Sequence, residues 1–173
     1  MRLPAASSLA VVILGLAFVP PASAVHLQVQ GGRSYMDGHA TSAAFAETVF
    51  ASRRIGDSHF SWAPDVSVGW IGGRALARYD DRRYRTRDDV WLLAAGARFR
   101  YADPMDGRGL FLSVQPALQR GRTQGLSSGY EFVSTLGWQG EHVSVQLRHV
   151  SNAGLHGPNR GETMALLGIG FDL

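Results

Sequence analysis

The residues best suited to chemistry are a histidine and a serine near the C-terminus, His149 and Ser151, in the stretch LRHVSNAGLHGPN. Apolar residues alternate with polar ones in the preceding VSVQL, and their parity continues into His149 and then Ser151. Two residues apart on a β-strand, they project from one face about 6.6 Å apart. A serine hydroxyl becomes a nucleophile when a base takes its proton. Taken alone, the pair is equally compatible with a serine hydrolase and with an interfacial polar pair without chemistry.

The N-terminal sequence predicts that the chain carrying this pair is exported. The chain has 173 residues, a length typical of one domain. Arg2 is followed by the apolar run LAVVILGLAF and the small-residue site ASA, which is the layout of a secretory signal peptide. The run is too short for a transmembrane helix, which needs about 20 apolar residues. We predict a signal peptide over residues 1–24 and a single domain over 25–173.

Beyond residue 24 the dominant sequence period is two, which is typical of half-buried strands. Eight segments show it, the second less regularly than the others. They are residues 25–30, 43–52, 60–70, 91–101, 110–119, 130–138, 143–147 and 165–173. The fold class we predict is all-β, an eight-stranded antiparallel transmembrane β-barrel.

The polar parity of these segments distinguishes a membrane barrel from a soluble barrel with an apolar interior. It carries Arg98, Arg100, Gln115, Glu131, Gln146 and Arg148. These side chains suit a polar or ion-paired interior. Aromatic residues near strand ends fit the two interfacial girdles of a membrane barrel; they are Trp70, Trp91, Tyr101, Tyr130 and Trp138. A β-sandwich with these aromatic residues in its core is the remaining alternative.

Loop lengths orient the predicted barrel. Short turns are expected near residues 53–57, 102–108 and 139–141, on the periplasmic side. The opposite, outer connections are longer, above all residues 72–89. This segment carries Arg74, Arg78, Arg82, Arg83, Arg85 and Arg87. We expect these basic loops to face anionic material on the outer leaflet, with part of their charge neutralised by neighbouring aspartates. His149 and Ser151 then lie at the depth of outer-leaflet glycolipid, on the lipid side.

The stretch RHVSNAGLHGPNRG resembles the signature of the PagL-type lipid A 3-O-deacylases, which are eight-stranded outer-membrane barrels. The resemblance implies hydrolysis of the ester-linked hydroxyacyl chain at the 3-position of lipid A. It assigns Ser151 as the nucleophile and His149 as the general base. Asn152, Gly154 and Asn159 are placed around the oxyanion, where N–H donors stabilise the tetrahedral intermediate. Outside this stretch, the chain resembles the family only in its general organisation, namely a predicted signal peptide, the number of predicted strands and the chain length.

The acid that orients the histidine is predicted as Glu162. In the family a glutamate follows the Asn-x-Gly with one residue between, whereas Glu162 follows Gly161 directly. Strict parity from the last strand would direct Glu162 inward and Thr163 outward. Either the strand start is irregular and Glu162 reaches His149, or the triad is incomplete. We choose Glu162, because losing a triad acid is costly to catalysis.

The leading hypothesis is an enzyme of the bacterial outer membrane that acts on lipid A, the lipid part of lipopolysaccharide, at the outer leaflet. We expect no cofactor, no metal and no nucleic-acid partner; a homodimer is compatible with the sequence. One alternative is a non-catalytic outer-membrane barrel for adhesion or envelope structure, with the basic loops as its binding surface. Another is a phospholipase of the same membrane.

Overall fold

The computed structural model describes residues 25–76, 86–101, 108–157 and 159–173, and the predicted signal peptide lies outside them. In these residues the regular structure is all β. The strands are β1 (His26–Met36), β2 (His39–Val49), β3 (Arg53–Arg54), β4 (Phe60–Ile71), β5 (Val90–Tyr101), β6 (Gly109–Arg120), β7 (Tyr130–Gln139), β8 (Val143–Ser151) and β9 (Glu162–Asp172).

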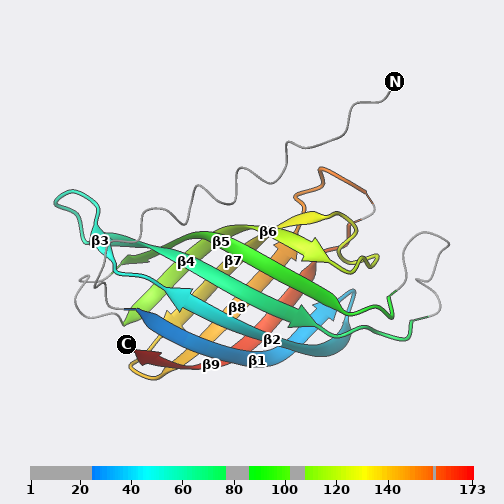
Figure 1. The fold of residues 1–173 in the computed structure, drawn as a ribbon, viewed down its shortest axis with the longest axis horizontal. Helices are drawn as coiled ribbons and strands as arrows, with labels where there is room; N and C mark the ends of the chain where they lie inside the picture. Colours follow the sequence, from blue (N-terminus) through cyan, green and yellow to red (C-terminus); the bar gives the residue numbers. More distant parts are fainter. Residues whose placement is uncertain (1–24, 77–85, 102–107, 158) are drawn as a thin grey trace.

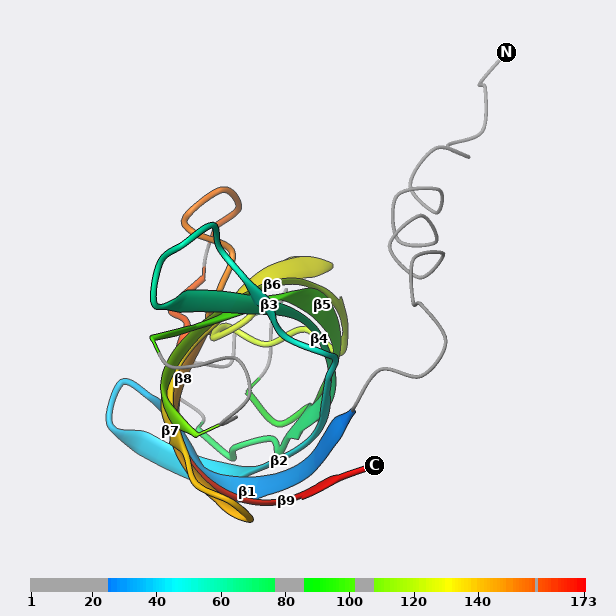
Figure 2. The same cartoon turned by 90° about the vertical axis from the view of Figure 1, so that its left-hand side faces the viewer.

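Every strand pairing is antiparallel, in the order β2-β1-β9-β8-β7-β6-β5-β4, and β2 also pairs with β4. This last pairing closes the sheet, and Figure 2 shows the resulting ring of strands. β3 has two residues and pairs only with the start of β4. The fold is therefore a closed, eight-stranded antiparallel barrel, as the sequence predicts.

The two ends of the barrel differ. β1, β4, β6 and β8 finish at one end, which we call the long-loop end, and it lies to the right in Figure 1. There β1 and β2 are joined by a two-residue turn, Asp37 (φ 47°) and Gly38 (φ 79°). Such a turn with both φ values positive matches the twist of a β-hairpin. Other connections at this end, including residues 152–161, are longer.

The described part of the chain contains no helix of the length and apolar character needed to cross a membrane.

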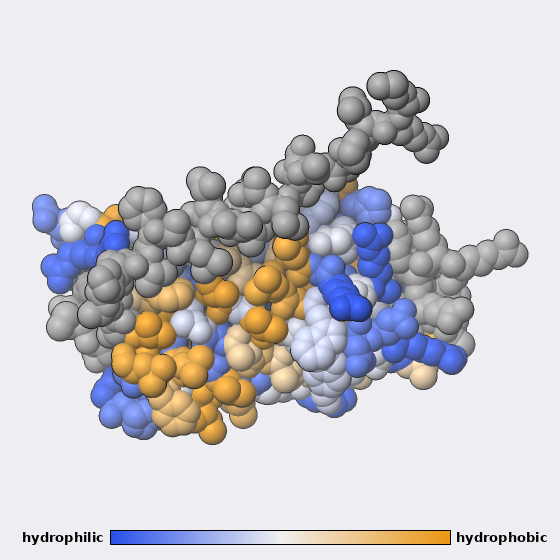
Figure 3. Space-filling view, in the orientation of Figure 1, coloured by the Kyte–Doolittle hydropathy of each residue, from blue (hydrophilic) through white to orange (hydrophobic). Residues whose placement is uncertain are grey.

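The outward parity of the long strands is apolar and exposed. Exposed outward side chains include Val29, Leu93, Leu112, Leu136, Val145, Leu167 and Ile169. In Figure 3 the apolar side chains gather in a band around the middle of the visible face, with polar residues toward both ends. Trp70 pairs with Trp91 at the long-loop end, whereas Tyr101 and Trp138 lie near the other end of their strands. This arrangement is typical of a membrane barrel with two aromatic girdles.

The inward parity carries a buried charged network. Glu47 forms ion pairs with Arg98 (2.9 Å) and Arg148 (3.2 Å), and all three side chains are fully buried. The guanidinium carbons of Arg98 and Arg148 lie 3.9 Å and 4.3 Å from the ring centres of Phe111 and Phe45. Buried charges require such partners, because an unpaired charge in a low-dielectric interior is strongly destabilising.

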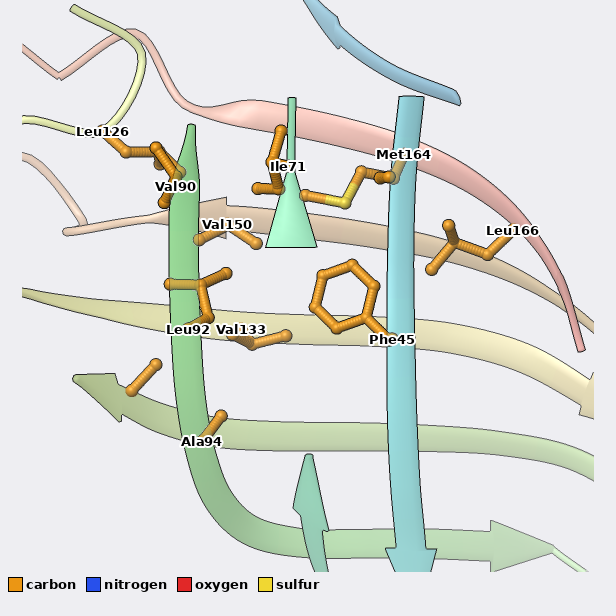
Figure 4. Packing of buried hydrophobic residues seen from close by; sticks show 12 residues of the cluster. Phe45, Ile71, Val90, Leu92, Ala94, Leu126, Val133, Val150, Met164 and Leu166 are labelled. Atoms are coloured by element: carbon orange, nitrogen blue, oxygen red, sulfur yellow. The ribbon is translucent and has the colours of Figure 1, made fainter. Parts of the chain in front are cut away.

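A second interior zone is apolar. Phe45, Ile71, Leu92, Leu126, Val133, Val150, Met164 and Leu166 pack together with four smaller or neighbouring residues (Figure 4). Ile71 and Val150 are the last or next-to-last residues of β4 and β8, so this cluster extends to the long-loop end. The interior is thus not uniformly polar, although the sequence prediction was based only on its polar members.

Candidate functional site

His149 and Ser151 occupy the end of β8 at the long-loop end of the barrel. Between them, Val150 is completely buried and packs in the apolar interior cluster. Successive side chains of a strand point to opposite faces, so burying Val150 directs His149 and Ser151 outward. His149 is exposed and Ser151 is half-buried. The predicted base and nucleophile therefore share the lipid-facing side of one strand.

The His149 ring is held by the start of β9. Its Nδ1 lies 2.9 Å from Thr163 Oγ1, and the two residues are direct partners in the β8–β9 ladder. The ring also lies over Gly161, where a Cβ atom would come within 2.9 Å of Cε1 and 3.2 Å of Nε2. Gly161 has a φ of 73°, which disfavours any side chain. The backbone at 161 and the hydroxyl at 163 together fix the imidazole.

The turn that follows Ser151 is shaped by Asn152. Its Oδ1 accepts a hydrogen bond from the N–H of Gly154 (3.1 Å), and Ala153 and Gly154 have φ values of 56° and 75°. Asn152 Nδ2 donates to the carbonyl of His156 (2.6 Å) and to Ser128 Oγ (3.2 Å). Asparagine often stabilises a turn through its own side chain in this way.

The three residues expected around the oxyanion all have their described donors engaged elsewhere. Asn152 Nδ2 and the Gly154 N–H bond within the turn. Asn159 Nδ2 donates to both carboxylate oxygens of Glu131, at 3.0 Å and 3.1 Å. Ser128 Oγ also donates to Glu131, at 2.8 Å, so one carboxylate links the β6–β7 and β8–β9 connections. These side chains shape the loops next to Ser151.

Glu162 is placed differently from the expectation that it orients His149. Its side chain is buried on the inner face, where Arg74 Nη1 and Nη2 donate to its two carboxylate oxygens at 2.6 Å and 2.7 Å. Ser34 Oγ donates to the same carboxylate at 2.6 Å. β9 begins at Glu162 and alternates regularly from its first residue, so Glu162 points inward and Thr163 outward. The start of β9 is therefore regular, and the residue beside His149 is Thr163 and not Glu162.

Arg74 also requires a correction, because the sequence placed it among outer-loop arginines that face anionic material. The structure buries Arg74 against Glu162 and the carbonyl of Ser34. The adjoining segment is held by Asp89, which accepts hydrogen bonds from the Gly73 N–H (2.9 Å) and Trp70 Nε1 (3.1 Å). These two hydrogen bonds lower the pKa of the Asp89 carboxyl. Arg78, Arg82, Arg83 and Arg85 lie outside the described residues.

The β8–β9 connection is attached to two other connections at the same end. The N–H groups of Arg160 and Gly161 donate to the carbonyls of Gln124 (3.2 Å) and Gly125 (2.9 Å). Arg160 also forms an ion pair with Asp37 in the β1–β2 turn. These contacts fix Gly161 beneath the histidine ring. Sequence reasoning missed the role of Gly161, although a glycine at a strand entry is a signal for a special backbone conformation.

Comparison with known proteins gives a family match and a matching fold. The family model for "Lipid A 3-O-deacylase (PagL)" matches residues 15–172. The solved structure described as the outer membrane enzyme PagL superposes with a TM-score of 0.62 at 17% identity, covering 86% of this chain and 99% of that one. The attachment invasion locus protein Ail of Yersinia pestis, solved with sucrose octasulfate, reaches a TM-score of 0.38 at 12% identity, covering 86% and 97%. No curated protein matches.

Proposed function

Because this chain belongs to the PagL family of lipid A 3-O-deacylases, outer-membrane hydrolases, we propose that it acts as a serine esterase through Ser151 and His149. The observation that carries the proposal is the pair itself: both residues face outward at the end of β8, and the ring of His149 is fixed by Thr163. The substrate bond is the ester of the 3-O-linked hydroxyacyl chain of lipid A, and the released product is a 3-hydroxy fatty acid.

In the first half-reaction, Ser151 Oγ attacks the ester carbonyl carbon while His149 Nε2 takes the hydroxyl proton. The tetrahedral intermediate collapses, and the sugar oxygen leaves with the proton from His149, which leaves an acyl-serine. In the second half-reaction, His149 takes a proton from water, and the resulting hydroxide attacks the acyl-serine. His149 then returns the proton to Ser151 Oγ as the fatty acid leaves.

Thr163 is the partner that we assign to His149 in this cycle. With Nδ1 hydrogen-bonded to Thr163 Oγ1, Nε2 is the ring nitrogen left to exchange protons with serine. A hydroxyl can accept a hydrogen bond from Nδ1–H and so fix both tautomer and orientation, but it supplies no negative charge to stabilise the imidazolium. We propose that Glu162, paired with Arg74 inside the barrel, supports the start of β9 and is not a catalytic residue.

For the oxyanion we propose the backbone N–H groups of Asn152 and Ala153, in the turn that follows Ser151, because the Gly154 N–H already donates to Asn152 Oδ1. The hydrogen bonds of Asn152 to Gly154 and His156 support this, because they hold the turn in one shape before substrate binds. Preorganised backbone donors are worth most where they need no rearrangement during the reaction. Asn159 contributes indirectly, since its bonds to Glu131 hold the same connection.

We further propose that residues 1–24 are a signal peptide and that the long-loop end faces the cell exterior, which brings the site to the outer leaflet. The exposed apolar side chains that precede His149 on the outward face of β8 and its neighbour β9, such as Leu147 and Leu167, support this placement. Lipid A would then reach Ser151 sideways from the membrane. His149, Ser151 and Thr163 come from one chain, so the mechanism does not require a homodimer.

The test is the mass spectrum of lipid A from cells that express the chain, beside cells that express Ser151→Ala at an equal level. We expect the wild-type chain to remove one hydroxyacyl group and the variant to remove none, while both migrate as folded barrels in unheated electrophoresis. Intact lipid A in the presence of folded wild-type barrel would favour the adhesion or envelope alternative. Equally fast hydrolysis of glycerophospholipid esters by purified protein would favour a phospholipase.

A further inference from the structure

Arg33 faces outward from the barrel wall near the long-loop end. Arg33 lies in β1, three residues before the strand ends at Met36, and its side chain is exposed with the outward series of the strand. In the outward parity of the eight long strands described, the other permanently charged residue is Arg120, the last residue of β6. That parity of those strands contains no carboxylate.

The sheet register places Arg33 close to the candidate catalytic pair. Tyr35 of β1 is the partner of Thr163, and Thr163 is the partner of His149. Arg33 lies one outward position deeper in the membrane than Tyr35. It is separated from β8 by β9 alone, a lateral distance of about 10 Å at the usual spacing of strands. A long arginine side chain that snorkels toward the interface moves to the level of His149.

The partners of Arg33 differ from those of the interior arginines. Arg74, Arg98 and Arg148 each meet a glutamate inside the barrel. The hydrogen bond described for Arg33 runs from Nη1 to Ser42 Oγ (3.2 Å), on the exposed face of β2. A hydroxyl leaves the charge of the guanidinium uncompensated. A cation on the lipid face is destabilising unless it lies near the interface or meets an anion.

We propose that Arg33 binds a phosphate group of lipid A while the 3-O ester lies at Ser151. This inference rests on the proposed function and extends it to a recognition site. The planar guanidinium matches phosphate oxygens through two parallel hydrogen bonds, which are strong at a poorly hydrated boundary. Ser42 Oγ accepts a hydrogen bond from one guanidinium nitrogen of Arg33, and the remaining N–H groups of the guanidinium can donate to the phosphate. The phosphate on the sugar backbone then sets which ester reaches the serine.

The kinetic test compares Arg33→Gln with the wild-type enzyme on two substrates in phospholipid-free detergent micelles: phosphorylated lipid A and lipid A stripped of its phosphates. We expect the variant to raise KM for phosphorylated lipid A about 10- to 100-fold, the range for a lost charge-assisted hydrogen bond, with little change in kcat. The two enzymes should be equal on the stripped substrate. Arg33→Lys, which keeps the charge but loses the fork, should lie between them.

Arg53→Gln is the matched control, because it removes an exposed arginine from β3, at the opposite end of the barrel, and should change neither KM. Equal losses for Arg33→Gln on both substrates, or no loss on phosphorylated lipid A, would overturn the inference. Phosphatidylglycerol added to the micelles distinguishes the source of phosphate. Strong competition that requires Arg33 would assign the site to phospholipid and overturn the lipid A assignment.

A binding measurement separates this inference from the proposed mechanism. In the Ser151→Ala background, which cannot form an acyl-serine, phosphorylated lipid A should bind more tightly than in the Ser151→Ala, Arg33→Gln double variant, by about the same 10- to 100-fold. This difference is expected even if wild-type protein hydrolyses no lipid A. Equal binding by the two variants would reject the phosphate site while leaving the esterase proposal intact.

Discussion

A single hydroxyl, that of Thr163, stands where a histidine-dependent hydrolase usually has a carboxylate. Thr163 Oγ1 lies 2.9 Å from His149 Nδ1, which is the position that the carboxylate of a catalytic triad would take. The hydroxyl supplies the hydrogen-bonding geometry of that carboxylate but not its negative charge. In the proposed mechanism, such a site would orient His149 but give little help to the imidazolium that forms during attack. Variants of Thr163 can therefore separate two contributions to the reaction rate: the orientation of the histidine ring and the negative charge beside it.

Replacing Thr163 tests this separation. Thr163→Val keeps the shape and removes the hydrogen bond, so kcat should fall about tenfold, the value of one such bond, while Thr163→Ser should keep most activity. Thr163→Glu supplies charge at the same outward position and should raise kcat above wild type. The measurement is the initial rate of lipid A deacylation by refolded barrels. A Thr163→Val enzyme as fast as wild type would remove Thr163 from the site.

At this scale the sequence predicted part of the candidate site. Alternation alone placed His149 and Ser151 on one outward face, and the structure confirms that placement. Alternation also directed Glu162 inward, but the resemblance favoured an acid, and the choice of Glu162 followed chemistry instead of parity. The partner of Glu162 could not be predicted, because Arg74 follows β4 in a segment without periodicity.

At the scale of elements, the start of β9 depends on the buried pair of Glu162 and Arg74. The side chains are 2% and 6% exposed, and two hydrogen bonds join them. Removing one partner leaves the other charge buried and unpaired, which typically costs about 3–5 kcal/mol. The pair therefore ties the segment after β4 to the first residue of β9, next to Thr163.

Glu162→Ala should accordingly lower the free energy of unfolding by about 3–5 kcal/mol, measured by urea titration of the refolded barrel. The double change Glu162→Leu with Arg74→Met should recover most of the loss, because apolar groups of similar size need no partner. Activity per folded molecule should stay within a few-fold of wild type in the double variant. A drop by several orders of magnitude there would return Glu162 to the catalytic residues.

The positions of the strands could be predicted from the sequence, but the packing inside the barrel could be predicted only in part. Regular alternation located the strands, and β2 shows its inward residues clearly only in the structure. Adjacent apolar pairs such as Leu92-Leu93 and Leu166-Leu167 hide their parity in the sequence, because one member faces lipid and the other faces inward. The apolar cluster behind Val150 therefore appeared only once the strands were paired.

At the scale of the whole molecule, an apolar exterior surrounds an interior with a charged zone and an apolar zone. The apolar zone reaches the long-loop end and supports β8 from behind, through Val150. A packed interior resists deformation, so we expect it to hold the end of β8, with His149 and Ser151, in a fixed position. In the proposed function, the barrel is a scaffold whose outer face carries the candidate catalytic residues, while its packed interior plays no part in substrate binding.

The meeting of the first and last strands has a consequence for where the chain can be cut. Val25 and Leu173 exchange backbone hydrogen bonds (3.4 Å and 2.8 Å), and β1 pairs with β9 along its length. A circular permutant that joins these residues by a short linker and begins at Glu141, in the turn between β7 and β8, would carry β8, β9, β1 and β2 as one continuous segment. His149, Thr163, Arg33 and Ser42, now split between the two ends of the sequence, would then be encoded together.

We expect this permutant, behind an added export signal or refolded in detergent, to form the barrel and deacylate lipid A within about tenfold of the wild-type rate, since exposed turns tolerate new termini. A permutant opened between Asn152 and Gly161 is the comparison, because it breaks the connection that holds Gly161 under the histidine ring. It should fold and lose activity. The residues of the candidate site would thus lie on four consecutive strands, a meander that the natural order of the chain divides in two.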